Sequence, residues 1–76
     1  MRLKIVDINY TGNFKWMYKL SNGAEDDFYI MQEDFYRYYG LKTPVSRQRL
    51  EYLDVGHWLS CNVEVIDGLK VVTNFI

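Results

Sequence analysis

The sequence contains one cysteine and one histidine, and this scarcity excludes several classes of protein. With Cys61 alone no intramolecular disulfide forms, so the chain is not a disulfide-stapled secreted scaffold. His57 stands four residues from Cys61, about 13 Å along a strand, which is too far for a catalytic pair. One His and one Cys also provide no zinc-ligand spacing, and the glycines fall singly. We expect no catalytic residues, no metal and no cofactor.

Long apolar runs are missing as well. No stretch approaches the roughly 20 apolar residues of a membrane-spanning helix. The start of the chain, from Met1 to Tyr10, alternates polar and apolar residues and lacks the continuous apolar core of a signal peptide. We therefore expect a cytoplasmic protein without membrane contact. The formal net charge is -1, so any nucleic-acid binding depends on a local basic patch.

The composition that is present is that of a globular domain. Hydrophobic residues make up 49% of the chain and charged residues 25%, which argues against disorder. A length of 76 residues supports one hydrophobic core and no second one, so we predict a single domain over residues 1–76. Aromatic residues reach 17%, and their large buried area helps a small β domain to be stable.

Alternation of polar and apolar residues predicts strands along most of the chain. Turn residues separate the strands at Thr11-Gly12-Asn13, at Asn22-Gly23 and at Asp67-Gly68, and the last two are strong hairpin signals. The predicted strands are 3–10, 14–20, 28–31, 57–66 and 69–76.

The pattern changes to helical spacing between the third and fourth strands. We predict a short helix from Gln32 to Tyr39, with Glu33 and Asp34 in its first turn and Gly40 as a left-handed cap. A second helical turn is predicted from Ser46 to Leu53. The order of elements predicts a mainly β fold, a five-stranded OB-like barrel with a helical insert between strands three and four.

Three segments resemble the cold-shock domain. Gly12-Asn13-Phe14-Lys15-Trp16-Met17-Tyr18 is similar to the aromatic second strand of that family, and Asp26-Asp27-Phe28-Tyr29-Ile30 to the third, with Ile30 in place of a ligand-contacting His. Leu53-Asp54-Val55-Gly56 is similar to the Leu-x-x-Gly turn of the family. The resemblance implies an OB fold and a single-stranded nucleic-acid ligand on strands two and three.

The aromatic face of the second strand has two interpretations. If Phe14, Trp16 and Tyr18 are exposed, they stack unpaired bases while lysines on the same strand approach phosphates. If the strand is half buried, the same face belongs to the core, because the lysines of the other face require water. Burial is favoured for Phe14, and the pattern leaves Trp16 and Tyr18 open. With basic residues of the insert added, the predicted nucleic-acid-binding residues are Lys15, Trp16, Tyr18, Lys19, Phe28, Arg37, Lys42, Arg47 and Arg49.

A protein-interaction module is the alternative hypothesis. Arg and Tyr are enriched at protein interfaces, so the Tyr-rich insert suits a protein partner as well as a phosphate backbone. Such a module, for example an accessory or inhibitory factor of a mobile element, would dock through that insert or through an exposed barrel edge. The near-neutral net charge favours this alternative. The aromatic and basic residues of the second strand favour single-stranded DNA or RNA as the ligand. The oligomeric state stays open.

Overall fold

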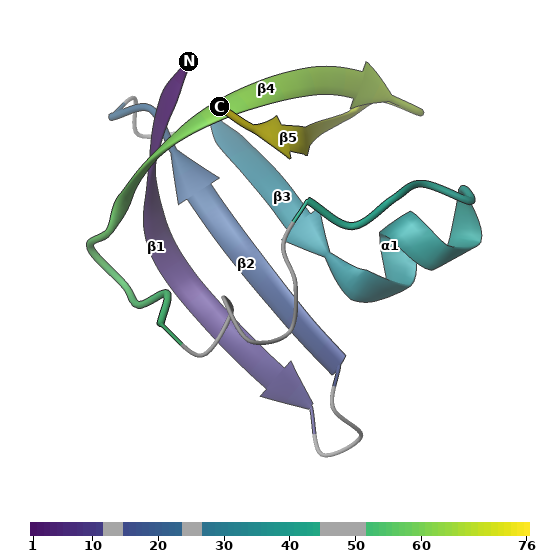
Figure 1. Cartoon of the computed structure of the whole chain (residues 1–76), viewed down its shortest axis with the longest axis horizontal. Coiled ribbons are helices and arrows are strands. Elements are labelled where there is room, and N and C mark those ends of the chain that lie inside the picture. Colours follow the sequence, from purple (N-terminus) through teal and green to yellow (C-terminus); the bar gives the residue numbers. More distant parts are fainter. Residues whose placement is uncertain (12–14, 24–26, 45–51) are drawn as a thin grey trace.

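The computed structural model describes residues 1–11, 15–23, 27–44 and 52–76 (Figure 1). In the described residues the strands close a barrel in the order β1-β2-β3-β5-β4. All neighbouring strands are antiparallel except β3 and β5, which run parallel. The predicted mainly β fold, a five-stranded barrel with a helix between strands three and four, is confirmed. Its elements are β1 (Arg2–Thr11), β2 (Lys15–Ser21), β3 (Phe28–Gln32), α1 (Glu33–Tyr38), β4 (Trp58–Ile66) and β5 (Leu69–Phe75).

β1 closes the barrel by pairing with both β2 and β4. Its register on β2 shifts between Ile5 and Asp7, so that Val6 is a bulged residue, and a bulge bends its strand. At the bulge the chain leading into β4 adds two backbone hydrogen bonds. The Ile5 amide donates to the His57 carbonyl at 2.9 Å, and the Gly56 amide donates to the Ile5 carbonyl at 2.8 Å. This segment therefore extends the β1–β4 seam beyond the strand ladder.

The two hairpins predicted by glycine-containing turns are both present. Asp67 and Gly68 have positive φ angles of 54° and 79°, as a two-residue type I′ turn requires, and the flanking Ile66 and Leu69 pair directly. The β2–β3 connection is longer than a two-residue Asn-Gly turn, because Ser21 pairs with Phe28 and residues 22–27 join the strands. Asn-Gly starts this reversal without completing it.

Helix α1 ends as the sequence indicates. Gly40 has a φ of 65°, which suits a residue without a side chain. The Gly40 amide donates to the Arg37 carbonyl at 3.2 Å and the Leu41 amide to the Tyr36 carbonyl at 2.8 Å. These two bonds form a Schellman motif, which satisfies carbonyls that the helix leaves without partners. The predicted second helix, Ser46–Leu53, lies largely outside the described residues.

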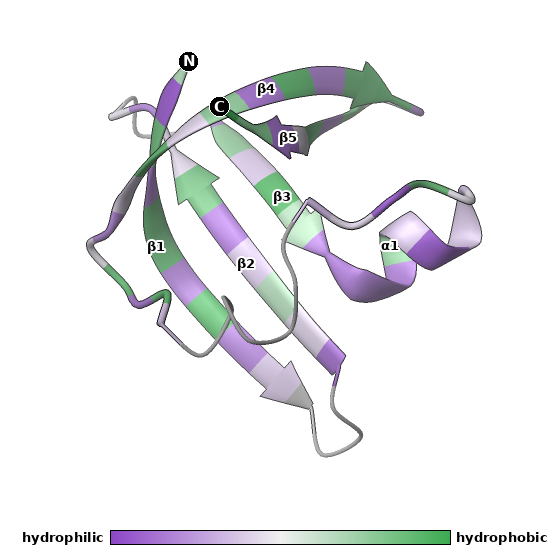
Figure 2. Cartoon of the chain, viewed as in Figure 1, coloured by the Kyte–Doolittle hydropathy of each residue, from purple (hydrophilic) through white to green (hydrophobic). Residues whose placement is uncertain are grey.

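The inward faces of the strands and one side of α1 form a single core. Bands of hydrophobic and hydrophilic residues alternate along β1 and β2 (Figure 2), as expected for strands with one buried face. Tyr36 anchors α1 in this core, because its ring is fully buried and its hydroxyl donates to the Val72 carbonyl of β5. The buried hydrophobic residues are Leu3, Ile5, Trp16, Tyr18, Leu20, Tyr29, Met31, Tyr36, Cys61, Val71 and Val72.

The base-stacking role predicted for Trp16 and Tyr18 is wrong, because both rings belong to the core. Trp16 is 8% exposed and Tyr18 is 0% exposed. The Trp16 ring centroid lies 5.7 Å from that of Tyr18 and 6.1 Å from that of Tyr36, so α1 and the closed sheet cover this face. Barrel closure decides the outcome, since a closed sheet has one inner face and the largest apolar side chains fill it.

Candidate functional site

The structure disperses most of the residues predicted to bind nucleic acid. The Lys15 ammonium lies 3.2 Å from a carboxylate oxygen of Asp34 in α1, and the Arg37 guanidinium lies 3.1 Å from Glu33 one turn away on the same helix. Lys42 is exposed in the segment after α1. Arg47, Arg49 and Phe14 lie outside the described residues. Trp16 and Tyr18 are in the core.

One predicted pair does come together on the outside of the barrel. Lys19 of β2 and Phe28 of β3 both face outward, and the Lys19 ammonium lies 3.9 Å from the centroid of the Phe28 ring. Phe28 is 38% exposed. A cation over an exposed aromatic ring contributes about 0.5–1 kcal/mol, so this contact stabilises the position of the Phe28 ring only weakly. The ring stays partly exposed beside the ammonium.

Phe28 is the first member of a row that crosses the outside of four adjacent strands. It pairs with Ser21 of β2, Ser21 pairs with Lys4 of β1, and Lys4 pairs with Trp58 of β4. The row faces outward, because the strand residues next to its members are buried at Leu3, Ile5, Leu20 and Tyr29 and packed against the core at Leu59, although Ser21 in the middle is itself only 7% exposed. We call it the outer row, and it consists of Phe28, Ser21, Lys4 and Trp58.

The two ends of the outer row have the same construction. Trp58 is 48% exposed, and the guanidinium carbon of Arg2 lies 5.9 Å from the centroid of its ring. Phe28 at the other end carries Lys19 in the corresponding role. Each exposed ring therefore has a cation beside it. Both cations stand on strands next to the ring they contact, β1 for Trp58 and β2 for Phe28.

The described cations differ in whether they form ion pairs, and Lys42 after α1 shares the unpaired state of the cations around the outer row. Three of the described cations form ion pairs, namely Lys15, Arg37 and Lys70, with acids at Asp34, Glu33 and Asp27. Within the described ranges Arg2, Lys4 and Lys19 form no ion pair, although Asp7 stands opposite Lys19 in the β1–β2 ladder. Lys4 of the outer row and the two cations beside its rings therefore have no described acid as an ion-pair partner, and the chain as a whole has a net charge of -1.

Sequence reasoning missed Arg2, Lys4 and Trp58, although part of the signal was present. Alternation puts Arg2 and Lys4 on the face opposite the apolar residues of the first strand, and it puts Trp58 opposite Leu59 and Cys61. What alternation lacks is the register between strands. Lys4 and Trp58 become neighbours only because β1 and β4 close the barrel, across 54 positions of the chain.

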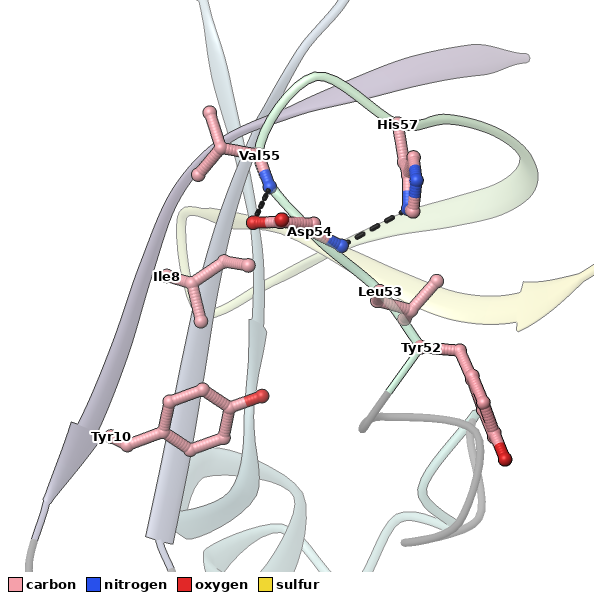
Figure 3. A pocket seen from close by; sticks show the side chains of 7 residues that line it. All are labelled: Ile8, Tyr10, Tyr52, Leu53, Asp54, Val55 and His57. Carbon is pink, nitrogen blue, oxygen red and sulfur yellow. Dashed lines mark hydrogen bonds between the residues drawn. The ribbon is translucent and has the colours of Figure 1, made fainter.

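A concave feature lies at the other end of β1. It is an open groove of about 570 Å³ lined by Ile8, Tyr10, Tyr52, Leu53, Asp54, Val55 and His57 (Figure 3). Its polar groups are engaged in a turn, because the Asp54 amide donates to Nδ1 of His57 at 3.0 Å and the Val55 amide to the Asp54 carboxylate at 2.7 Å. Among the described residues, the lining holds two Tyr and no Lys or Arg, which suits a protein surface better than a phosphate.

The perturbed ionisable groups are held protonated at neutral pH. Burial raises the pKa of Cys61 to about 11, and burial likewise raises the pKa values of Tyr18 and Tyr36. A hydrogen bond to Asp67 raises the pKa of Tyr39 to about 12. These groups stabilise the fold as neutral donors or apolar surface. The described ranges hold no group of three or more His, Cys, Asp or Glu that could bind a metal ion.

Comparisons with protein-family models, with curated proteins and with solved structures find no match to this chain. None of the helical structure in the described residues is both long and apolar enough to cross a membrane.

Proposed function

We propose that the protein is a non-catalytic, cytoplasmic module that binds single-stranded nucleic acid on the outer row of an OB-like barrel. The observation that carries the proposal is the pair of exposed rings, Phe28 and Trp58, each with a cation beside it and with Lys4 between them. Exposed aromatic rings that alternate with cations are the usual elements of single-strand binding. The resemblance of the Phe28 segment to the third strand of cold-shock domains supports the same ligand.

The energetics of the ring contacts support an exchange on binding. A base stacked on an aromatic side chain contributes about 1–3 kcal/mol, whereas the cation that now lies against the ring contributes about 0.5–1 kcal/mol. A base therefore displaces the cation from the ring, and the cation then contacts a phosphate. Bases in a duplex are stacked and paired already and do not present a free face. The outer row thus favours single strands.

A fluorescence titration tests the proposal directly. Single-stranded DNA and RNA of about 20 nucleotides are added at low and at moderate salt while tryptophan emission is followed. We expect quenching of the exposed Trp58, with an affinity that falls as salt rises because phosphate contacts release counterions. Absence of quenching by both polymers at micromolar protein would contradict the proposal.

A charge-reversal pair identifies the surface that binds. Lys4→Glu replaces the central cation of the outer row with an acid, and we expect it to abolish detectable binding. Lys42→Glu is the matched control, because Lys42 is an exposed cation that lies outside the strands of the row. Equal losses in the two variants would mean that binding depends on net charge alone and not on the outer row.

A protein partner is the second candidate, and an open strand edge favours it. β4 pairs with β1 only as far as Cys61, whose backbone exchanges hydrogen bonds with Met1. Beyond that point, β4 has β5 on one side and no described strand on the other. Val65 on this stretch is 70% exposed. An extended segment of an inhibited or assisted protein would add there as a further strand.

The two candidates respond differently to nuclease. A tagged form of the chain that recovers a stoichiometric protein from lysate after nuclease treatment favours the protein partner. A Val65→Pro variant removes a backbone donor from β4, so loss of that partner in this variant assigns it to the open edge. Recovery that disappears with nuclease treatment favours the nucleic-acid ligand.

A further inference from the structure

We infer that a single strand bridges the two rings of the outer row, with two bases that are not neighbours in the strand stacked on Phe28 and on Trp58 and with the backbone between them crossing Lys4. This inference rests on the proposed function and specifies its ligand. It predicts how many nucleotides separate the two stacked bases, and this number follows from the register of the strands that carry Phe28 and Trp58.

The distance between the rings comes from the sheet. Phe28 and Trp58 stand on β3 and β4, with β2 and β1 between them, so three inter-strand spacings separate them. At roughly 4.8 Å per spacing, the two backbone positions that carry the rings are about 14 Å apart along the curved sheet. Successive nucleotides of a stacked strand rise only about 3.4 Å. A stacked strand would cover the distance with about three intervening nucleotides, and an extended strand with fewer.

The middle of the outer row has no ring to hold an intervening base. Ser21 is only 7% exposed, and its hydroxyl accepts a hydrogen bond from the Gly23 amide at 3.1 Å. Lys4, the other central residue, is exposed and forms no ion pair among the described residues. The Lys ammonium is a compact charge at the end of a flexible side chain, so it can contact a phosphate but does not distinguish one base from another. The intervening nucleotides therefore contribute phosphates, and their bases are dispensable.

Oligonucleotides with only two bases test this spacing. Each probe is an eight-nucleotide DNA strand that carries two thymines separated by zero, one, two, three or four abasic positions, and the remaining positions are abasic too. Because every probe has the same number of phosphates, the electrostatic contribution is constant and differences report stacking. We expect adjacent thymines to reach one ring only. Thymines with one to three abasic positions between them should bind roughly 5- to 150-fold more tightly, because a second stacked base contributes about 1–3 kcal/mol.

Two variants and one control link the spacing to the rings. Phe28→Ala and Trp58→Ala should each flatten the dependence on spacing, because either one removes one of the two stacking surfaces. Tyr38→Ala removes a ring that is 82% exposed on α1, away from the outer row, and should leave the profile unchanged. A profile that is flat in the unmodified protein, or one that peaks for adjacent thymines, would overturn the inference.

The inference and the proposed function fail in different ways. If a 20-nucleotide strand binds but the two-thymine probes show no preferred spacing, the proposed function stands and the two-ring arrangement is wrong. If the 20-nucleotide strand does not bind, both are wrong. Urea unfolding of each variant separates a loss of binding from a loss of folding, which is needed because Phe28 is 38% exposed and Trp58 48% exposed, so part of each ring is buried.

Discussion

The two tryptophans of this barrel have opposite environments. Trp16 lies on the inner face of β2, 8% exposed and packed between Tyr18 and Tyr36. Trp58 lies on the outer face of β4, 48% exposed and in contact with Arg2. The strand with the most aromatic residues contributes them to the core, and the sparse row of outward rings is the proposed binding surface. A high density of aromatic residues on one strand of a small barrel thus indicates a packed core rather than a binding surface.

The cations on the outside of the barrel differ in whether a described acid neutralises them. Lys15 on β2 is neutralised by Asp34 of α1. Lys4 and Arg2 on β1 form no ion pair in the part of the chain that the structure describes. Exposed ion pairs contribute only about 0–1 kcal/mol to stability, but they do reduce the charge that a surface offers to a phosphate. A lysine count along the sequence therefore overestimates the basic character of the β2 face.

We expect the largest effect in the free energy of unfolding, which should fall much more when Trp16 is replaced than when Trp58 is replaced. Trp16→Ala removes a buried ring and should cost about 3–5 kcal/mol, out of a total of roughly 4–11 kcal/mol for a domain of 76 residues. Trp58→Ala should change the free energy of unfolding by less than about 1 kcal/mol. Urea unfolding followed by circular dichroism measures both. Similar losses for the two variants would erase the distinction between inner and outer rings.

The next effect should appear in binding. Trp58→Ala should weaken single-strand affinity by about 1–3 kcal/mol, the contribution of one stacked base, while its unfolding midpoint stays close to that of the unmodified protein. Tyr38→Ala, which removes another exposed ring, should retain full affinity. Fluorescence anisotropy of a labelled oligonucleotide provides the measurement for both variants. If Tyr38→Ala loses as much affinity, the ligand lies over α1 instead of the outer row.

A smaller effect should distinguish the two classes of lysine. Lys4→Ala should reduce the slope of log K against log salt by about 0.7, as expected for the loss of one phosphate contact on a single strand. Lys15→Ala should leave that slope nearly unchanged, because its ammonium is paired with Asp34. Binding isotherms at several salt concentrations give both slopes. Equal slopes in the two variants would show that Lys4 does not contact a phosphate.

The smallest effect concerns the free energy of unfolding and comes from Cys61, a residue of the inner face. It is absent at neutral pH and appears only in alkaline solution. Burial raises the pKa of the Cys61 thiol from 9.0 to about 11, so the thiol ionises more readily in the unfolded chain than in the folded one. Below about pH 9 the thiol is protonated in both states and has no effect on the pH dependence. Between about pH 9 and 11 ionisation favours the unfolded chain, and stability should fall.

Urea midpoints at intervals from about pH 8 to pH 10 measure this loss. Cys61→Ala should lower stability at every pH but flatten the decline above about pH 9, because the variant has no thiol to ionise. Keeping to this range limits the contribution of the buried tyrosines, whose ordinary pKa is 10.0 and whose ionisation acts in the same direction. An equally steep decline in the variant would exclude Cys61 as the cause.

Several elements could be predicted because they depend on a few neighbouring residues. Asp67-Gly68 specifies a tight turn through two positive φ angles, and Gly40 ends α1 through a local pair of backbone hydrogen bonds. The β2–β3 connection could not be read in the same way, because its length depends on the pairing of Ser21 with Phe28. Of the predicted binding residues, Lys19 and Phe28 remain on the candidate site, while Trp16 and Tyr18 became core.

By itself, the sequence determined the strands, their two faces and the order of the elements, since alternation, turns and caps act over a few residues. Only the tertiary structure decided which aromatic face became the inside and which outward residues became neighbours. Closure of β1 on β4 joins Lys4 to Trp58, and pairing of β2 with its neighbours joins Phe28 to the same row. The physical reason is that register is a property of paired strands. The residues that meet on a surface made of four strands therefore cannot be predicted from any one segment of the sequence.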